Sequence, residues 1–159
     1  MTIKPGETLP ETTFMTMTAD GPAPKTTGDV FSGRTVALFA VPGAFTPTCS
    51  AKHLPGFIDK ADDLKAKGVD AVACTAVNDV FVMDAWAKAE GADGIEMLAD
   101  GNAAFAKAIG LDMDGSRFGL GPRSQRYVML VRDGTVEKLF VEEPGDFKVS
   151  SAEHLLSEM

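Results

Sequence analysis

The sequence predicts an α/β fold in which helices flank a central mixed β-sheet. Two apolar runs of strand length, 35–41 and 69–77, are each followed by a segment whose apolar residues recur at helical spacing. Strands that alternate with helices in this way pair in parallel. An Asp-Gly pair at 133–134 lies between two further apolar runs and predicts an antiparallel hairpin. The sheet is therefore expected to contain both kinds of pairing.

The strands of the N-terminal half are an edge hairpin and two central strands. Residues 12–18 alternate weakly before an Asp-Gly turn at 20–21, which predicts the hairpin. The runs 35–41 and 69–77 are apolar almost throughout, as is typical of strands that are buried on both faces.

Two helices follow the central strands. The first begins after Thr46 and ends at Gly68, because glycine commonly stands just past a helix C-terminus. Pro55 lies inside it and is expected to kink the helix or to shift its hydrogen bonds. The second helix spans 79–90. Its predicted inward residues are Phe81, Val82, Ala85, Trp86 and Ala89.

The C-terminal half completes the sheet. We expect a strand at 95–98, a helix at 102–109, a glycine-rich loop at 111–122, strands at 126–131 and 136–141, and a helix at 151–159 with Ser151 as its N-cap. Alternating elements that end in a hairpin and a helix favour a thioredoxin-like arrangement. With 159 residues, 45% of them hydrophobic, the chain is expected to form a single domain over 1–159.

Charge and cysteine content narrow the possible functions. A net charge of −8 argues against nucleic acid or an anionic membrane as partner, because both need a basic surface. We expect a cytoplasmic protein, since the first residues lack an apolar signal region and no segment approaches the ~20 apolar residues of a membrane span. Two cysteines form no disulfide framework, and ligand spacings and nucleotide-binding motifs are missing, so no metal and no cofactor are predicted.

Cys49 is the candidate nucleophile. If Thr46 is the N-cap, Pro47 stands at the first helical position and Cys49 at the third. A thiol in the first turn lies near free backbone amides and the positive end of the helix dipole, which favour the thiolate. A fast thiol reaction also needs donors that stabilise charge developing on the substrate's oxygens, and backbone amides with a fixed guanidinium are the available kind.

The segment Pro42-Gly43-Ala44-Phe45-Thr46-Pro47-Thr48-Cys49-Ser50, continued by His53-Leu54-Pro55-Gly56-Phe57, resembles the active-site signature of the peroxiredoxins, specifically of their type-5 branch. Val77-Asn78-Asp79 and Arg123-Ser124-Gln125-Arg126-Tyr127 extend the likeness over nearly the whole chain. The resemblance implies a thiol-dependent peroxidase of hydrogen peroxide and organic hydroperoxides that serves antioxidant defence.

The same resemblance implies the residue roles. Cys49 would attack the terminal oxygen of the peroxide and become a sulfenic acid. Pro42 would shield the thiolate, Thr46 would hydrogen-bond the thiolate and the peroxide, and Arg126 would support both. Other residues of the motif are expected to contact the substrate: Gly43, Phe45 and Thr48. Arg123 competes with Arg126, which we prefer because it opens a strand, and a strand positions a side chain better than a loop does.

The second cysteine decides how the cycle is expected to close. Cys74 lies in an apolar strand and is interpreted as a small buried hydrophobe. Two-cysteine members of the branch carry a resolving cysteine near the C-terminus, whereas the stretch 142–151 has none. This difference predicts a one-cysteine cycle in which an external thiol reduces Cys49. Glutathione, with or without glutaredoxin, is the first choice of reductant and thioredoxin the second.

Rival functions remain at this point. A peroxide sensor or chaperone-like redox switch would use oxidation of Cys49 without turnover. A thiol-disulfide oxidoreductase is disfavoured, because Thr46 stands where the first cysteine of a C-x-x-C pair would be. His53 shares a helix face with Cys49 and is interpreted as structural or as a rim residue. The pair Glu142-Glu143 is interpreted as part of a solvated face.

The family also implies a homodimer whose loops meet near the active sites. Apolar residues in the loops, Phe45, Phe118 and Leu120, are consistent with such an interface.

Overall fold

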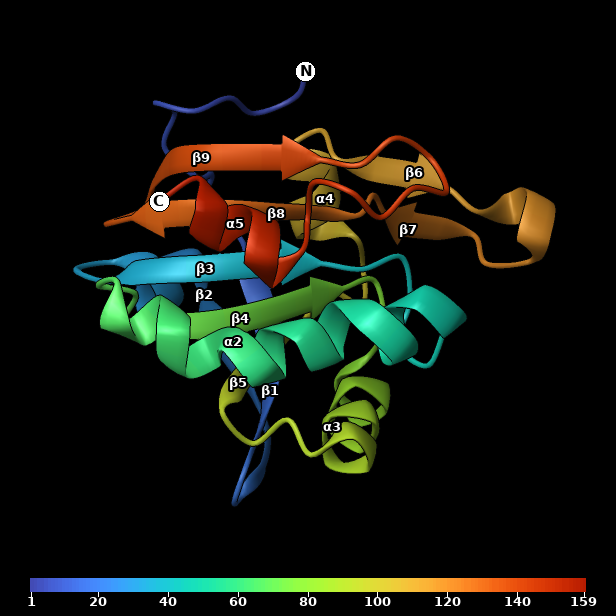
Figure 1. Cartoon of the computed structure of the whole chain (residues 1–159). Helices are drawn as coiled ribbons and strands as arrows, with labels where there is room; N and C mark the ends of the chain where they lie inside the picture. The colour runs from blue at the N-terminus through green and yellow to red at the C-terminus, as the bar shows by residue number, and fades with distance from the viewer.

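The computed structural model describes residues 1–159 and contains a seven-stranded mixed sheet (Figure 1). The strand order is β2-β1-β5-β4-β3-β8-β9, with β3, β4 and β5 parallel and the other pairs antiparallel. The strands are β1 Thr13–Thr18, β2 Gly21–Thr26, β3 Thr35–Ala40, β4 Ala71–Ala76, β5 Ile95–Ala99, β8 Tyr127–Arg132 and β9 Thr135–Val141. The predicted α/β class with a mixed sheet is confirmed.

Helices cover both faces of this sheet. They are α1 Thr27–Phe31, α2 Leu54–Ala66, α3 Val80–Glu90, α4 Ala104–Ala108 and α5 Ala152–Ser157. Residues of α2, α3 and α5 share one buried apolar cluster with the sheet, and residues of α1 and α4 share a second cluster with it. In Figure 1 α2, α3 and α5 lie in front of the sheet and α4 lies behind it. No helix is long and apolar enough to span a bilayer.

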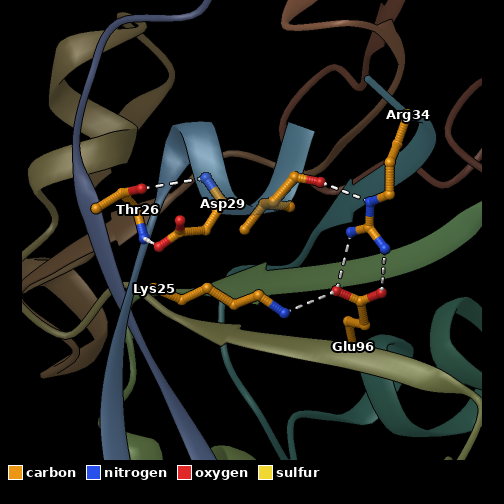
Figure 2. A network of polar contacts seen from close by, with 6 residues as sticks. Lys25, Thr26, Asp29, Arg34 and Glu96 are labelled. Carbon is orange, nitrogen blue, oxygen red and sulfur yellow. Dashed lines mark hydrogen bonds and ion pairs between the residues drawn. The ribbon is translucent and has the colours of Figure 1, made fainter. Parts of the chain in front are cut away.

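A polar network fixes the hairpin edge of the sheet. Glu96 of β5 accepts from Arg34 Nη1 and Nη2 at 3.1 and 3.2 Å and from Lys25 Nζ at 3.3 Å (Figure 2). Thr26 caps α1 by exchanging hydrogen bonds with Asp29. The half-buried carboxylate and its two cations therefore join β2, β5 and the start of β3 at the end of the sheet where β3 begins.

Several sequence predictions are confirmed at the level of elements. The N-terminal hairpin forms, and the hairpin at 133–134 has the left-handed backbone that an Asp-Gly turn needs, with φ of 48° and 78°. Ser151 Oγ accepts from His154 N and caps α5. Gly68, with φ of 100°, follows the C-cap of α2.

Three details differ from the prediction. The loop expected at 111–122 contains a small hairpin, β6 Asp112–Asp114 with β7 Pro122–Ser124, around a 3-10 turn at Ser116–Phe118. Helix α1 was not predicted, because five residues give too little periodicity to detect. The buried side of α3 is made by Val80, Met83 and Trp86, whereas Phe81, Ala85 and Ala89 are exposed. Only Trp86 of the predicted inward set is fully buried, since the apolar residues of this helix also extend onto its outer face.

The helix after Thr46 contains the local shift expected from Pro55. It begins at Pro47, passes through a π-helical turn at Cys49–His53 and continues as α2. Leu54 N donates to Cys49 O, five residues earlier. Pro55 has no amide hydrogen, so the register changes directly before it without breaking the helix.

Candidate active site

Cys49 lies in the first turn of the helix that follows β3 and is fully buried. Ser50 N donates to Thr46 O at 2.9 Å, which confirms that Thr46 is the residue from which the helix starts. The amides of Thr48 and Cys49 donate to no backbone oxygen. The sulfur therefore sits beside free donors at the positive end of a helix, an environment that stabilises negative charge.

Arg126 is the guanidinium that reaches the thiol. It directly precedes β8, and its Nη2 donates to Cys49 Sγ at 3.1 Å. Arg123 instead donates from Nε to Leu120 O at 3.0 Å and from Nη1 to Pro42 O at 3.4 Å. The structure thus brings Cys49 and Arg126 together. It places Arg123 against the loop between β3 and the helical turn that contains Cys49.

Of the two expectations for His53, a structural residue or a rim residue, the structure excludes the rim position. His53 is fully buried, its Nδ1 accepts from Arg126 Nη1 at 2.8 Å, and its Nε2 lies 2.9 Å from Ser150 O. Burial, together with the neighbouring charge of Arg126, lowers the pKa of His53 to about 3. The ring is therefore neutral at physiological pH.

Glu142 also departs from the prediction of a solvated face. It is 7% exposed, and its carboxylate accepts from the amides of Lys148, Val149 and Ser150 and from the Ser150 hydroxyl at 2.7–2.9 Å. These hydrogen bonds outweigh the effect of burial and lower the pKa of Glu142. Burial of a carboxylate is unfavourable unless several donors hydrogen-bond to it. The sequence alone does not show that such donors lie close to Glu142.

Thr46 and the loop before it differ in one contact from the expectation. Thr46 Oγ1 donates to Gly43 O at 2.7 Å, so it makes no hydrogen bond to Cys49. The carbonyl of Gly43 is the nearer acceptor because the loop turns back on itself, with Phe45 in the left-handed region at a φ of 64°. Because its hydrogen is donated to Gly43 O, the Thr46 oxygen remains free to accept a hydrogen bond from a substrate.

A cleft of about 660 Å³ opens next to the thiol. Pro42, Thr48 and Arg126 line it beside Cys49, and the other lining residues are Gln125 and members of the segments 113–118 and 142–146. Phe45 and Phe118 are large apolar side chains with exposed fractions of 54% and 74%. Of the predicted substrate-contacting residues, Thr48 lines the cleft, Gly43 is buried in the adjacent loop, and Phe45 points into solvent.

Cys74 lies mid-strand in β4 and is fully buried. Burial, with a smaller contribution from the neighbouring Cys49, raises the pKa of the Cys74 thiol well above its usual range. Its sulfur is therefore a protonated and weakly reactive group, as expected of a small buried hydrophobe. No group of three or more His, Cys, Asp or Glu side chains is arranged to hold a metal ion.

Comparisons with known proteins identify relatives of this chain in sequence and in structure. A family model described as Redoxin matches residues 4–156. The chloroplastic peroxiredoxin-2E-2 of Oryza sativa subsp. japonica is 51% identical over 161 residues, which cover 98% of this chain and 72% of the rice protein. Reduced Prx3 of Vibrio vulnificus, solved in complex with H2O2, is 53% identical, has a TM-score of 0.95, and is covered over 98% of both chains.

A third relative is peroxiredoxin 5 of Alvinella pompejana, which is 35% identical with a TM-score of 0.85, over 98% of this chain and 96% of that chain. The predicted thioredoxin-like arrangement is confirmed by these structural similarities.

Proposed function

This chain belongs to the peroxiredoxin family and is a thiol peroxidase, and from that premise we propose that it reduces hydrogen peroxide and organic hydroperoxides through Cys49 in a one-cysteine cycle. The observation that carries the proposal is the contact of 3.1 Å between Arg126 Nη2 and Cys49 Sγ, next to the free amides of Thr48 and Cys49. A cation that is hydrogen-bonded to the sulfur thus lies beside a helical turn with two free amide donors.

The proposed first step is attack of the Cys49 thiolate on the terminal peroxide oxygen. The S–O bond forms as the O–O bond breaks, so the sulfur is oxidised to the sulfenic acid and the peroxide is reduced to water or an alcohol, which takes up one proton. Arg126 and the free amides stabilise the negative charge that moves onto the leaving oxygen. Thr46 Oγ1 accepts the hydrogen bond of the peroxide, because its own hydrogen is held by Gly43 O.

The proposed reductive half uses thiols from outside the chain. A first thiol displaces water from the sulfenic acid to form a mixed disulfide, and a second thiol releases Cys49 and the oxidised reductant. Cys74 is a poor resolving group, since it is buried in β4 and its pKa is raised by burial. The connection 142–151 contains no cysteine. Glutathione, alone or with glutaredoxin, is the reductant we propose first, and thioredoxin second.

The finer family assignment is to the type-5 branch. It is supported by the motif around Cys49 and by the similarity to the Alvinella peroxiredoxin 5. We also propose a homodimer that buries Phe45 and Phe118, because large exposed aromatic side chains favour contact with another surface. A cytoplasmic location and a role in antioxidant defence complete the proposal.

Coupled turnover tests this function. Glutathione with glutaredoxin and glutathione reductase, or thioredoxin with its reductase, is supplied with peroxide, and NADPH oxidation is followed. We expect many turnovers per Cys49 and none from Cys49→Ser. A single stoichiometric oxidation in every system would instead indicate a sensor. Intact-mass measurement after one equivalent of peroxide tests the cycle, because quantitative loss of two hydrogens as a Cys49–Cys74 disulfide would reject the one-cysteine mechanism.

A further inference from the structure

The Arg126 guanidinium is held at two points. One amino group, Nη2, contacts the Cys49 sulfur, and the other, Nη1, contacts His53 Nδ1. Because a guanidinium is planar and rigid, fixing Nη1 also fixes the direction in which Nη2 points. The His53 contact therefore determines where the positive charge lies relative to the thiolate, although His53 makes no hydrogen bond to the sulfur itself.

The chemistry of the partners assigns the tautomer of His53. A guanidinium only donates, so Nδ1 must be the unprotonated nitrogen that accepts from Arg126. A backbone carbonyl only accepts, so Nε2 carries the hydrogen and donates it to Ser150 O. The rings of Phe39, Phe57 and Phe147 pack against the His53 ring with centroids 5.0–5.6 Å away and restrain its orientation.

Glu142 sets the position of the Ser150 carbonyl. The connection from β9 to α5 has no helix or strand between 142 and 151. Within it, the Glu142 carboxylate gathers three successive amides, of Lys148, Val149 and Ser150, and the Ser150 hydroxyl. An acceptor with four donors holds this part of an irregular segment in one conformation, which places Ser150 O against His53 Nε2.

We infer that Glu142, the Ser150 carbonyl and His53 form a positioning chain that holds the Arg126 guanidinium against the Cys49 sulfur. The inference rests on the proposed role of Cys49 and deepens it. Its members are positioning residues, since none of them contacts the sulfur. This positioning chain extends the active site to the connection between β9 and α5, which the sequence motif around Cys49 does not include.

The positioning chain requires a neutral His53, because only an unprotonated Nδ1 can accept from Arg126. A protonated ring would direct an N–H at Arg126 Nη1 and would lose the hydrogen bond. The charged groups that act on the ring are Arg126, which lowers its pKa, and Glu142, which raises it less strongly. The buried ring therefore accepts from Arg126 over the whole physiological pH range.

The sharpest test removes the acceptor while filling the same space. His53→Leu abolishes the contact with Arg126, whereas His53→Gln supplies an amide oxygen for Arg126 and an amide N–H for Ser150 O. We expect His53→Leu to slow sulfenic acid formation by about 10- to 100-fold, the loss of one charge-assisted hydrogen bond, and His53→Gln by about fivefold or less. The rate of Cys49 alkylation by iodoacetamide should reach half of its maximum at a higher pH in His53→Leu than in the wild type.

Glu142→Gln tests the far end of the chain. The amide group replaces one acceptor oxygen by a donor, so we expect oxidation about three- to tenfold slower and a smaller upward movement of the alkylation profile. The controls are His154→Gln, at a partly exposed position of α5, and Glu137→Gln, at an exposed position of β9, and both should oxidise at the wild-type rate. Oxidation is followed by the fluorescence of Trp86, whose Nε1 donates to the Ser50 hydroxyl next to Cys49.

The outcomes separate the inference from the function on which it rests. Wild-type oxidation rates and alkylation profiles in folded His53→Leu or Glu142→Gln would overturn the positioning chain, with peroxidase activity intact. Equal slowing by His53→Gln and His53→Leu would also overturn it, because packing alone would then explain the effect. If His53→Leu does not fold, Glu142→Gln alone decides. Peroxidase turnover by Cys49→Ser would reject the proposed function instead.

Discussion

Arg123 and Arg126 are three residues apart and have different partners. Only Arg126 reaches the thiol, while Arg123 contacts backbone carbonyls of Leu120 and Pro42. We expect Arg126→Ala to slow sulfenic acid formation by about 10²- to 10³-fold, as loss of a donor to developing charge does, and Arg123→Ala by about tenfold or less. Stopped-flow oxidation with hydrogen peroxide measures both rates. Equal, small effects would contradict the assignment.

Sequence reasoning prefers Arg126 because the strand expected at 126–131 would begin there, whereas in the structure β8 begins at Tyr127 and Arg123 itself lies in β7. Arg126 is the arginine that contacts the thiol, but it does so from the connection between β7 and β8 and not from a strand. The same reasoning could not find His53 and Glu142 as members of the site. Their polar partners, Arg126 for His53 and the amides of 148–150 for Glu142, come from segments that only the folded chain brings together.

Tyr127 carries a buried side-chain polar atom that has no hydrogen-bond partner. Burial raises the pKa of its hydroxyl well above the usual range, so the group is neutral. Removing an unsatisfied hydroxyl without changing the ring relieves a desolvation cost, and Tyr127→Phe is expected to raise the free energy of unfolding by about 1 kcal/mol. Urea denaturation measures it. A loss of stability of that size would mean that the hydroxyl is bonded, for instance to buried water.

At the scale of elements, the loop between β3 and the helical turn that contains Cys49 leaves no room for a side chain at Gly43. A Cβ there would lie 2.9 Å from Arg123 Nη1 and 3.1 Å from Thr46 Cγ2. Gly43→Ala must therefore move Arg123 or Thr46, and we expect peroxide reduction to slow by about tenfold or more, since misplacing groups by about 1 Å has large kinetic effects.

Gly56 in α2 is the matched control for this substitution. A Cβ at Gly56 would meet nothing within 4 Å, so Gly56→Ala should keep the activity and raise stability by about 0.5–1 kcal/mol through helix propensity. The two variants are compared by turnover and by urea denaturation. Full activity in Gly43→Ala would show that the loop adjusts freely.

The elements themselves were largely predictable, and the exceptions have physical causes. Long apolar runs and Asp-Gly turns specify β3, β4 and the last hairpin, because burial and turn geometry act locally there. The π-helical turn at Cys49–His53 was foreseen only as an effect of Pro55, since the proline shows where a hydrogen bond is lost but does not show where it goes. The hairpin β6–β7 has three residues in each strand and gives too little alternation to detect.

At the scale of the molecule, the sheet order assembles the site. The strand β3 pairs antiparallel with β8, and β8 pairs antiparallel with β9. The end of β3, the start of β8 and the end of β9 therefore lie side by side at the same end of the strands. Cys49 follows the first, Arg126 directly precedes the second and Glu142 follows the third. The fold class was predictable from local patterns, but this meeting depends on strand order, which those patterns do not determine.

The buried neutral His53 makes the stability of the whole molecule depend on pH. Its folded pKa of about 3 lies below the ordinary value of 6.5. Between these values the unfolded chain binds more protons than the folded chain, so stability falls as the pH decreases through this window. Glu142 and Glu96, whose pKa values are lowered, add to this loss only below their ordinary value of 4.5. From pH 6.5 to 5 the loss of stability therefore comes chiefly from His53, and it is opposed by Asp100, whose pKa is raised by burial so that the folded chain binds a proton there more readily than the unfolded chain.

We expect the free energy of unfolding to decrease by about 2 kcal/mol between pH 7 and pH 5, which is 1.36 kcal/mol per unit over about 1.5 units. Urea denaturation at several pH values measures the slope. His53→Gln should flatten it, because glutamine does not titrate, whereas His154→Gln on α5 should leave most of it unchanged. A slope that survives in His53→Gln would mean that other groups take up the protons and that His53 is not held neutral by the fold. A slope that disappears with His53 would tie global stability to the same buried ring that orients Arg126.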